Sequence, residues 1–303
     1  MADTSTDAQR VLTLITHPLT PCLDHSIMDG VRDAVGAKAA YILADGIACD
    51  IPLPHAEVPF AAVERAARSV LDDRPIDVVV QEADTRRKSV LLADMDSTLI
   101  HQECIDELAA EAGVGERVAA ITAKAMAGDL DFEAALTERV GLLKGLPRSI
   151  IQKVVAERIS YVSGGRELVS TMKANGGYCA LVSGGFTEFT NIVAGKLGFD
   201  ENRANTFAFE NDVFTGNVVP PILGREAKVE ALQEVCALRN VPLWDAIAVG
   251  DGANDLGMLT RAGSGVALHA KPLVAEAAGM RIDHGDLSAL LYIQGYRKAD
   301  FVA

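Results

Sequence analysis

Paired cysteines and long apolar runs are both missing from this sequence of 303 residues. Its five cysteines are scattered, odd in number and without CxxC spacing, which argues against a disulfide framework or a zinc site and fits a reducing compartment. No uncharged apolar run reaches the roughly 18 residues of a membrane span. The acidic start MADTSTDAQR also lacks the apolar stretch of a signal peptide. We therefore expect a cytoplasmic protein with no membrane partner.

Basic residues are scarce as well, since 28 Lys and Arg face 42 Asp and Glu for a net charge of −14. Such a surface repels nucleic acid, so we expect no nucleic-acid partner, and an anionic substrate would need local cations. The P-loop pattern GxxxxGK[ST] does not occur. Aromatic residues make up only 5% of the chain and hydrophobic residues 49%, a composition typical of an α/β enzyme. The length suggests two domains of roughly 150 residues.

Residues 10–84 alternate strand-like and helix-like segments in the order βαββαβ, which is the ferredoxin-like pattern. Asp24 is expected to cap the first helix, Asp45-Gly46 predicts a hairpin turn, and a second helix is expected over 57–71. The charged stretch ADTRRKS then predicts a boundary near residue 86. The element order resembles ACT-like modules, so we expect an ACT-like N-terminal domain over 1–86.

The remainder of the chain, 87–303, carries continuous apolar runs that end in small or acidic residues and precede helical patterns. Three of these runs, at 89–94, 177–183 and 246–251, predict parallel strands that are buried on both faces. The pattern indicates a Rossmann-like, doubly wound parallel sheet. Ligands bind at the carboxyl ends of the strands in such a sheet.

More than 80 residues of almost purely helical pattern separate the first two of these strands. We expect about four helices that leave the sheet after its first strand and form a cap over the active face. The core would then span 87–101 and 166–303, with the cap at about 102–165. Further on, FAFENDVFTGNVV alternates around Asn211-Asp212 and predicts a β-hairpin.

Two carboxylates crowd the end of the first of these strands, in DMDST at 94–98. Side chains alternate along an extended chain, so Asp94 and Asp96 would point the same way, and both stay ionised easily only beside a cation. Asp251 ends another strand, and three carboxylates without His or Cys suit Mg²⁺ rather than Zn²⁺. The alternative is a solvated turn in which Asp94 caps a helix.

Two weaker features accompany these carboxylates. Ser183-Gly184-Gly185 offers a hydroxyl and unhindered amides for a phosphate, although an ordinary N-cap with a glycine turn explains it equally well. Lys228 could pair with the phosphate, but a lone helical lysine usually lies on a solvated face. With a nucleophilic carboxylate and a hard cation, these groups suit phosphoryl transfer through an aspartyl-phosphate.

The order DMDSTLI, LVSGGF, Lys228, GDGANDL resembles the haloacid dehalogenase superfamily of phosphatases. More narrowly, DMDSTLIHQECIDELA, DFEAALTERVGLLKGL and LVSGGFTEFT resemble the phosphoserine phosphatase family, over about residues 88–295. The resemblance implies Mg²⁺-dependent hydrolysis of a small molecule, O-phospho-L-serine, to L-serine and phosphate through an aspartyl-phosphate. This reaction is the last step of serine biosynthesis.

The same resemblance implies a role for each matched residue. Asp94 would be the nucleophile, and Asp96 would protonate the serine oxygen and then deprotonate the attacking water. The metal would lie between Asp94, the main-chain carbonyl of Asp96 and Asp251, while Asp255 would orient the loop or a metal-bound water. The residues that hold the phosphate would be Ser183, Gly184, Lys228 and Asn254.

Substrate selectivity is expected from the cap. Glu103 matches the family's ammonium-binding acid, and Arg139 matches its carboxylate-binding arginine, which can clamp bidentately. Each has an ordinary alternative: a first-turn helix acid for Glu103, and a surface arginine paired with Glu138 or Glu133 for Arg139. Phe132 matches a position that closes the cap, but its spacing fits cap core equally well, and we leave it out of the site.

Two other functions stay open. One is a phosphatase or phosphotransferase of the same superfamily that acts on another small phosphomonoester. The other is an amino-acid-sensing module with a secondary phosphatase core, which the ACT-like domain suggests. That domain shows no specific ligand residues, and because every matched motif follows residue 88 we expect it to be dispensable for the chemistry. The choice between a monomer and a homodimer is also open.

Overall fold

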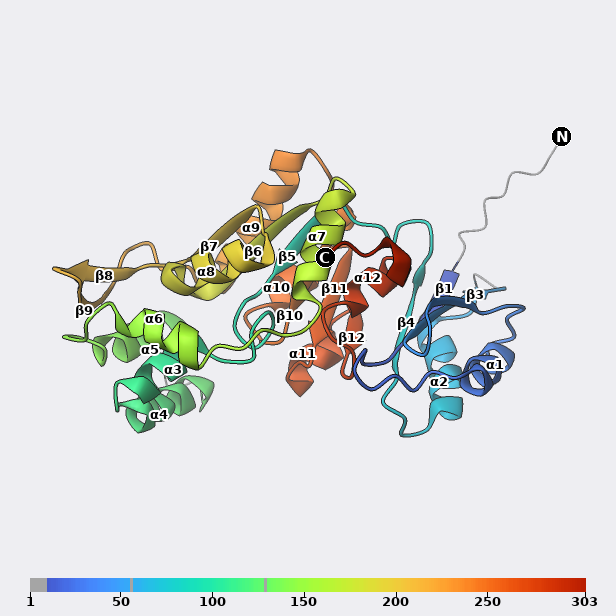
Figure 1. Ribbon diagram of the computed structural model, residues 1–303, viewed down its shortest axis with the longest axis horizontal. Helices are drawn as coiled ribbons and strands as arrows, with labels where there is room; N and C mark the ends of the chain where they lie inside the picture. The colour runs from blue at the N-terminus through green and yellow to red at the C-terminus, as the bar shows by residue number, and fades with distance from the viewer. Residues whose placement is uncertain (1–9, 55–56, 128–129) are drawn as a thin grey trace.

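The computed structural model describes residues 10–54, 57–127 and 130–303, which form two separate sheets, a group of helices and a small hairpin (Figure 1). The N-terminal sheet lies beside one edge of a larger parallel sheet, and the helical group lies toward the other edge (Figure 1). Among the described helices, none has the length and apolar character needed to span a bilayer.

The N-terminal sheet confirms the ferredoxin-like prediction. Its antiparallel strands follow the order β2-β3-β1-β4, and both helices pack against one cluster of buried side chains. The second helix starts at Phe60, later than predicted, because Pro59 holds the preceding chain extended. The elements are β1 (Arg10–Ile15), α1 (His25–Ala34), β2 (Tyr41–Ala44), β3 (Ala48–Leu53), α2 (Phe60–Leu71) and β4 (Asp77–Glu82).

The larger sheet is the predicted doubly wound one, with parallel strands in the order β12-β11-β10-β5-β6-β7. The strands are β5 (Val90–Ala93), β6 (Tyr178–Phe186), β7 (Glu201–Asn205), β10 (Ala246–Gly250), β11 (Ser264–Leu268) and β12 (Met280–Ile282). From β5 the chain adds β6 and β7 on one side, and later β10, β11 and β12 on the other side. The carboxyl ends of β10, β5 and β6 therefore flank the crevice where a ligand binds.

Helices cover both faces of this sheet, because the side chains of its buried strands alternate. Val90 and Leu92 pack into one core with α9 and α10, whereas Leu91 and Ala93 pack into another with α7, α8 and α12. The helices are α7 (Gly165–Ala174), α8 (Thr187–Leu197), α9 (Arg225–Arg239), α10 (Leu256–Leu259), α11 (Pro272–Ala277) and α12 (Ala289–Ile293).

Four helices follow the first strand, as predicted: α3 (Cys104–Glu111), α4 (Gly115–Ala127), α5 (Phe132–Gly141) and α6 (Ile150–Glu157). The chain enters and leaves this cap through two antiparallel segments that are hydrogen-bonded to each other. His101 N donates to the carbonyl of Ser160 at 3.0 Å, and Val162 N donates to that of Leu99 at 3.0 Å. The cap is thus connected to the sheet by a narrow two-stranded stem.

The predicted hairpin consists of β8 (Phe207–Glu210) and β9 (Val213–Val218). Its turn residues Asn211 and Asp212 both have positive φ, 52° and 59°, which is the backbone of a tight hairpin turn. The hairpin docks on the cap, which the sequence did not indicate. Gly145 N donates to the Phe214 carbonyl at 2.9 Å, and Phe214 N donates to that of Leu146 at 2.9 Å.

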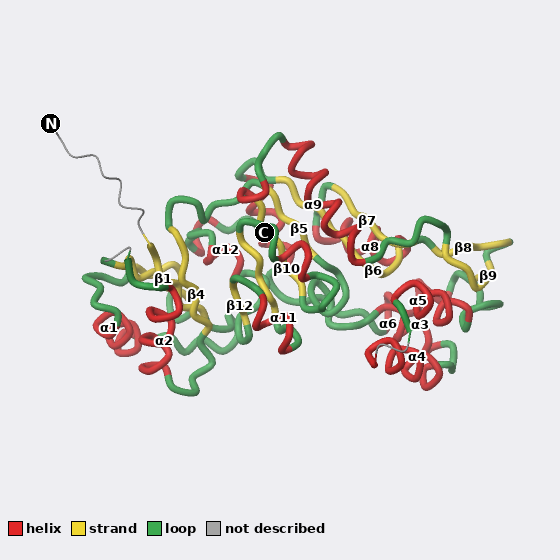
Figure 2. The backbone as a smooth tube through the Cα atoms, turned by 180° about the vertical axis from the view of Figure 1, so that it is seen from behind, coloured by secondary structure: helices red, strands yellow, loops and turns green. Residues whose placement is uncertain are grey.

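The charged stretch at the predicted domain boundary is bonded to the domains of both sheets. Arg86 forms an ion pair with Asp50 of the N-terminal sheet at 2.7 Å. Its neighbour Arg87 donates from Nε to the carbonyl of Gln294 at 3.1 Å. Strand β4 lies beside β12, so an edge of each sheet faces the other (Figure 2).

Candidate active site

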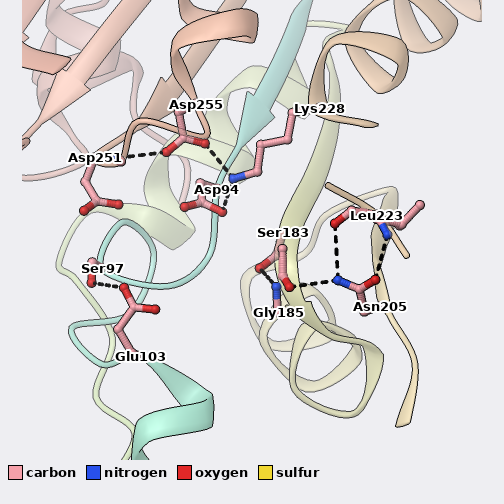
Figure 3. Close-up of polar contacts among 12 residues, drawn as sticks. Asp94, Ser97, Glu103, Ser183, Gly185, Asn205, Leu223, Lys228, Asp251 and Asp255 are labelled. Carbon is pink, nitrogen blue, oxygen red and sulfur yellow. Dashed lines mark hydrogen bonds and ion pairs between the residues drawn. The ribbon is translucent and has the colours of Figure 1, made fainter. Parts of the chain in front are cut away.

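Three carboxylates meet where β5 and β10 end. Asp94 follows β5, Asp251 follows β10, and Asp255 precedes α10, and each offers an oxygen that lies within 4.8 Å of the others (Figure 3). All three are buried. Asp255 is fully buried and belongs to the cluster itself, a more central place than the supporting role expected from the sequence.

Lys228 lies at the centre of this cluster rather than on a solvated face. It projects from α9, is only 2% exposed, and its Nζ donates to Asp94 Oδ1 and to Asp255 Oδ1, each at 2.6 Å (Figure 3). Burial acts to lower the pKa of Lys228, but the two carboxylates outweigh it and raise that pKa. The side chain is therefore a permanent cation.

One ammonium does not balance three carboxylates. Burial raises the pKa of Asp94 well above its ordinary value, with a further rise from Asp255, while Lys228 opposes both. Burial also raises the pKa of Asp251 to about 6. The excess negative charge and the all-oxygen donors make this a place for a hard divalent cation.

Asp96 has different surroundings from Asp94. Its Oδ1 accepts a hydrogen bond from the backbone N of Cys104 at 3.1 Å. Burial, and next the negative charge of Glu103, raise the pKa of Asp96 to about 7. Glu103 in turn accepts a 3.0 Å hydrogen bond from Ser97 Oγ, which joins the core loop to the start of the cap (Figure 3). Asp96 can therefore gain and lose a proton near neutral pH.

Ser183 lies inside strand β6 rather than at a helix start. The strand continues to Phe186, which is itself the N-cap position of α8, so the N-cap alternative for Ser183 is wrong. Ser183 Oγ accepts a 2.9 Å hydrogen bond from Gly185 N. A Cβ at Gly185 would lie 2.8 Å from Asp96 Oδ2, so only glycine permits this close approach.

Asn205 is a residue that the sequence reasoning missed. It is buried at the end of β7, where its Nδ2 donates to the carbonyl of Gly184 at 2.9 Å (Figure 3). Its Oδ1 accepts from Leu223 N at 2.7 Å. The amide thus fixes the Gly184 peptide in the strand that carries Ser183. An asparagine in an ordinary-looking strand gave no signal of this role.

A cavity of about 220 Å³ separates these strand ends from the cap. Most of the predicted residues line it, whereas Lys228 and Asp255 lie behind its floor, where Lys228 donates to Asp94 and Asp255 accepts from Gly252 N. Sequence reasoning missed Ile105, Leu136 and Lys271, and it left out Phe132, whose ring would contact a Cβ at Gly184. The predicted residues on its wall are Asp94, Asp96, Glu103, Arg139, Ser183, Gly184, Asp251 and Asn254.

Glu103 and Arg139 both face this cavity from the cap. Glu103 occupies the N-cap position of α3, but in the described part of the chain its side chain makes no capping hydrogen bond. Within the same residues, the charged neighbours that act on Arg139 are Asp106 and Glu103 rather than Glu133 or Glu138, and its Nε donates to the Ala135 carbonyl at 3.3 Å. The pairing expected for a surface Arg139 is therefore not realised, while Glu103 lies at a helix start and also faces the cavity.

Comparisons with known proteins agree with this arrangement. Residues 91–260 match the model of the haloacid dehalogenase-like hydrolase family. A phosphoserine phosphatase from Streptomyces coelicolor is 38% identical over 97% of this chain and 72% of its own length. A HAD family hydrolase from Salmonella enterica serovar Typhi superposes with a TM-score of 0.84 at 30% identity, covering 94% of this chain and 98% of its own.

A substrate-bound phosphoserine phosphatase structure is 41% identical, with a TM-score of 0.63, over 68% of this chain and 98% of its own. The chain belongs to the haloacid dehalogenase-like hydrolases, as the family match and these relatives show. Within that family it groups with the phosphoserine phosphatases.

Proposed function

We propose that this chain hydrolyses O-phospho-L-serine to L-serine and phosphate with Mg²⁺ as its cofactor. The observation that carries the proposal is the composition of one cavity. Its floor holds the carboxylate and lysine cluster, and its cap side presents Glu103 and Arg139. A phosphate at the floor would leave an ammonium for Glu103 and a carboxylate for Arg139, which are the two charges that phosphoserine carries.

The cluster fits the proposed ion by its donor chemistry. Carboxylate oxygens of Asp94 and Asp251, with the main-chain carbonyl of Asp96, would hold Mg²⁺, and Asp255 would orient the loop around it. When bound, Mg²⁺ supplies positive charge beside the transferring phosphoryl group. Lys228 supplies a second, permanent positive charge and offsets that of Asp94 as the dianionic ester approaches.

The reaction follows from the different surroundings of the two aspartates. Asp94 Oδ attacks phosphorus, and the bond from phosphorus to the serine oxygen breaks as Asp96 gives that oxygen its proton. Water then attacks the aspartyl-phosphate while Asp96 takes a proton from it, so that Asp94 is regenerated. Ser183, Gly184 and Asn254 would hold the phosphate oxygens throughout.

The cellular setting is part of the proposal. All five cysteines are free, which fits a reducing cytoplasm. We propose no nucleic-acid or membrane partner for the protein.

The oligomeric state is a separate question. Light scattering on the purified chain distinguishes a monomer from a homodimer.

The test is phosphate release from a panel of phosphomonoesters, with and without Mg²⁺. We expect O-phosphoserine to be the preferred ester and exhaustive EDTA treatment to remove turnover, with recovery on addition of Mg²⁺. Preference for a phosphomonoester that lacks the amino acid group would favour the other superfamily activities. Full turnover after EDTA would contradict the metal assignment.

Arg139→Ala tests substrate recognition directly. A hydrogen bond to a charged group contributes roughly 1.5–3 kcal/mol, so KM for phosphoserine should rise about 10- to 150-fold. Turnover of p-nitrophenyl phosphate should change little, because that ester has no carboxylate. Arg139→Lys is the matched control and should recover part of the loss. Equal loss for both esters would show that Arg139 contacts the phosphate or is structural.

A further inference from the structure

One carboxylate of the N-terminal sheet is bonded entirely to the other domain. Asp77, the first residue of β4, is 2% exposed. Its Oδ1 accepts from the backbone N of Asp283 at 2.8 Å and of His284 at 3.2 Å, and its Oδ2 accepts from Gly285 N at 2.7 Å. Three successive amides of the loop after β12 thus converge on one side chain from the neighbouring sheet.

That loop is bonded in turn to the end of the next strand. His269, directly after β11, contacts the Gly285 carbonyl through Nε2 at 2.8 Å, and its backbone N donates to the Ile282 carbonyl at 2.8 Å. His269 holds a positive φ of 46°, a conformation that costs a non-glycine residue free energy unless its surroundings enforce it. The bonds to the loop supply that enforcement.

The turn that begins at His269 reaches the catalytic floor. Lys271 N donates to the main-chain carbonyl of Asp251 at 3.2 Å, and Lys271 Nζ lies 4.0 Å from Asp251 Oδ2. Lys271 also lines the cavity. A continuous series of contacts therefore runs from Asp77 through the loop at 283–285 and through His269 to Asp251.

We propose that Asp77 is a positioning residue, through which the N-terminal domain sets the loop that carries Asp251. This inference rests on the proposed function only in that it takes Asp251 as a metal ligand. It also revises the expectation that the N-terminal domain is dispensable for the chemistry. A carboxylate suits this role because it can accept all three amide hydrogen bonds, whereas an asparagine would turn an NH₂ group toward one of them.

The experiment compares Asp77→Ala with Gln81→Ala in the full chain. Gln81 lies on the same strand and also bonds across the domains, but its Nε2 donates to the Ile293 carbonyl of α12 at 2.7 Å rather than to the loop at 283–285. Hydrogen exchange is measured at 250–256 and 268–272, and Mg²⁺ binding is measured by calorimetry with the metal alone. Should Asp77→Ala fail to fold, Asp77→Asn replaces it.

We expect Asp77→Ala, and not Gln81→Ala, to speed exchange in both segments and to weaken Mg²⁺ binding on the order of 10-fold. His269→Ala should have the same effect. Combining it with Asp77→Ala should cause no further loss. His269→Gln should recover part of the loss, because its side-chain NH₂ group can donate to the Gly285 carbonyl. Faster exchange confined to 283–285 with unchanged Mg²⁺ affinity, or equal effects of the Asp77 and Gln81 variants, would overturn the proposal. The exchange result is independent of which phosphate ester is the substrate.

Discussion

Asp94 and Asp96 are two residues apart on one loop, yet the structure gives them opposite neighbours. Burial and Asp255 raise the pKa of Asp94, and the ammonium of Lys228, in direct contact, opposes that rise. At Asp96 burial also raises the pKa, but the next largest effect, from Glu103, adds to the rise. A nucleophile must be ionised and a general acid must carry a proton. The direct contact of Asp94 with a cation, and the backbone amide that Asp96 accepts from instead, agree with the roles that we propose for the two residues.

Asp94→Asn should remove turnover while the fold is kept, because an amide does not attack phosphorus. Loss of a nucleophile lowers kcat by roughly three or more orders of magnitude. The buried Lys228 keeps its bond to Asp255 in this variant, so thermal unfolding should change little. Rates and unfolding are measured on the same preparation, and a phosphoenzyme trapped on a residue other than Asp94 would contradict the assignment.

Glu103→Gln should shift the pH dependence. In the reaction that we propose, Asp96 donates its proton in the first step, so kcat/KM should fall as pH rises through its pKa of about 7. Glu103 raises that pKa, and removing its charge lowers it, which moves the falling limb to lower pH. The measurement uses an alkyl phosphate without an ammonium group, so that recognition by Glu103 does not enter. If the falling limb of the kcat/KM profile stays at the same pH, Glu103 does not influence the group that titrates.

At the scale of elements, the strands, helices and hairpins could be predicted from the sequence. Buried strands, helical spacing and hairpin turns each leave a local pattern, and the residues at strand ends follow from topology. Asn205 and Phe132 left no such signal, because their roles depend on which distant segment folds against them. The docking of the hairpin on the cap was missed for the same reason.

Gly216→Ala should destabilise that docking. Gly216 has a φ of 84°, and an added Cβ would lie 3.0 Å from the Cβ of Lys144 on the cap. An L-residue in this region of φ costs roughly 1–2 kcal/mol. Gly141→Ala is the matched control, since a Cβ there meets open space in the same contact region and should stabilise α5 by about 0.5–1 kcal/mol. Urea unfolding of both variants measures the difference, and equal shifts would contradict the argument.

At the scale of the whole molecule, the N-terminal domain is the part whose role the sequence left open. Its fold could be predicted, because the order βαββαβ is local. Its contacts could not, because Asp77 reads as an ordinary strand residue, and its partners lie more than 200 residues further along the chain. The burial of a carboxylate against backbone amides is visible only once both sheets are placed.

Expression of residues 87–303 tests the domain as a unit. The truncated chain keeps every residue of the cavity but loses the acceptor for the amides at 283–285. We expect it to bind Mg²⁺ more weakly, by a factor similar to that for Asp77→Ala, on the order of 10-fold. A folded truncation with full metal affinity and turnover would show that the domain does not assist the site.

The stem of two antiparallel segments limits how the cap can move relative to the sheet. A cap attached only through this stem could rotate about it in any direction. The cap is also hydrogen-bonded to the hairpin, through Gly145 and Leu146, at a second point in the chain. With two points of attachment, the cap can rotate only about the line that joins the stem and the hairpin contact. The cavity would therefore open by a twist of the cap about that line, unless the hairpin is released first.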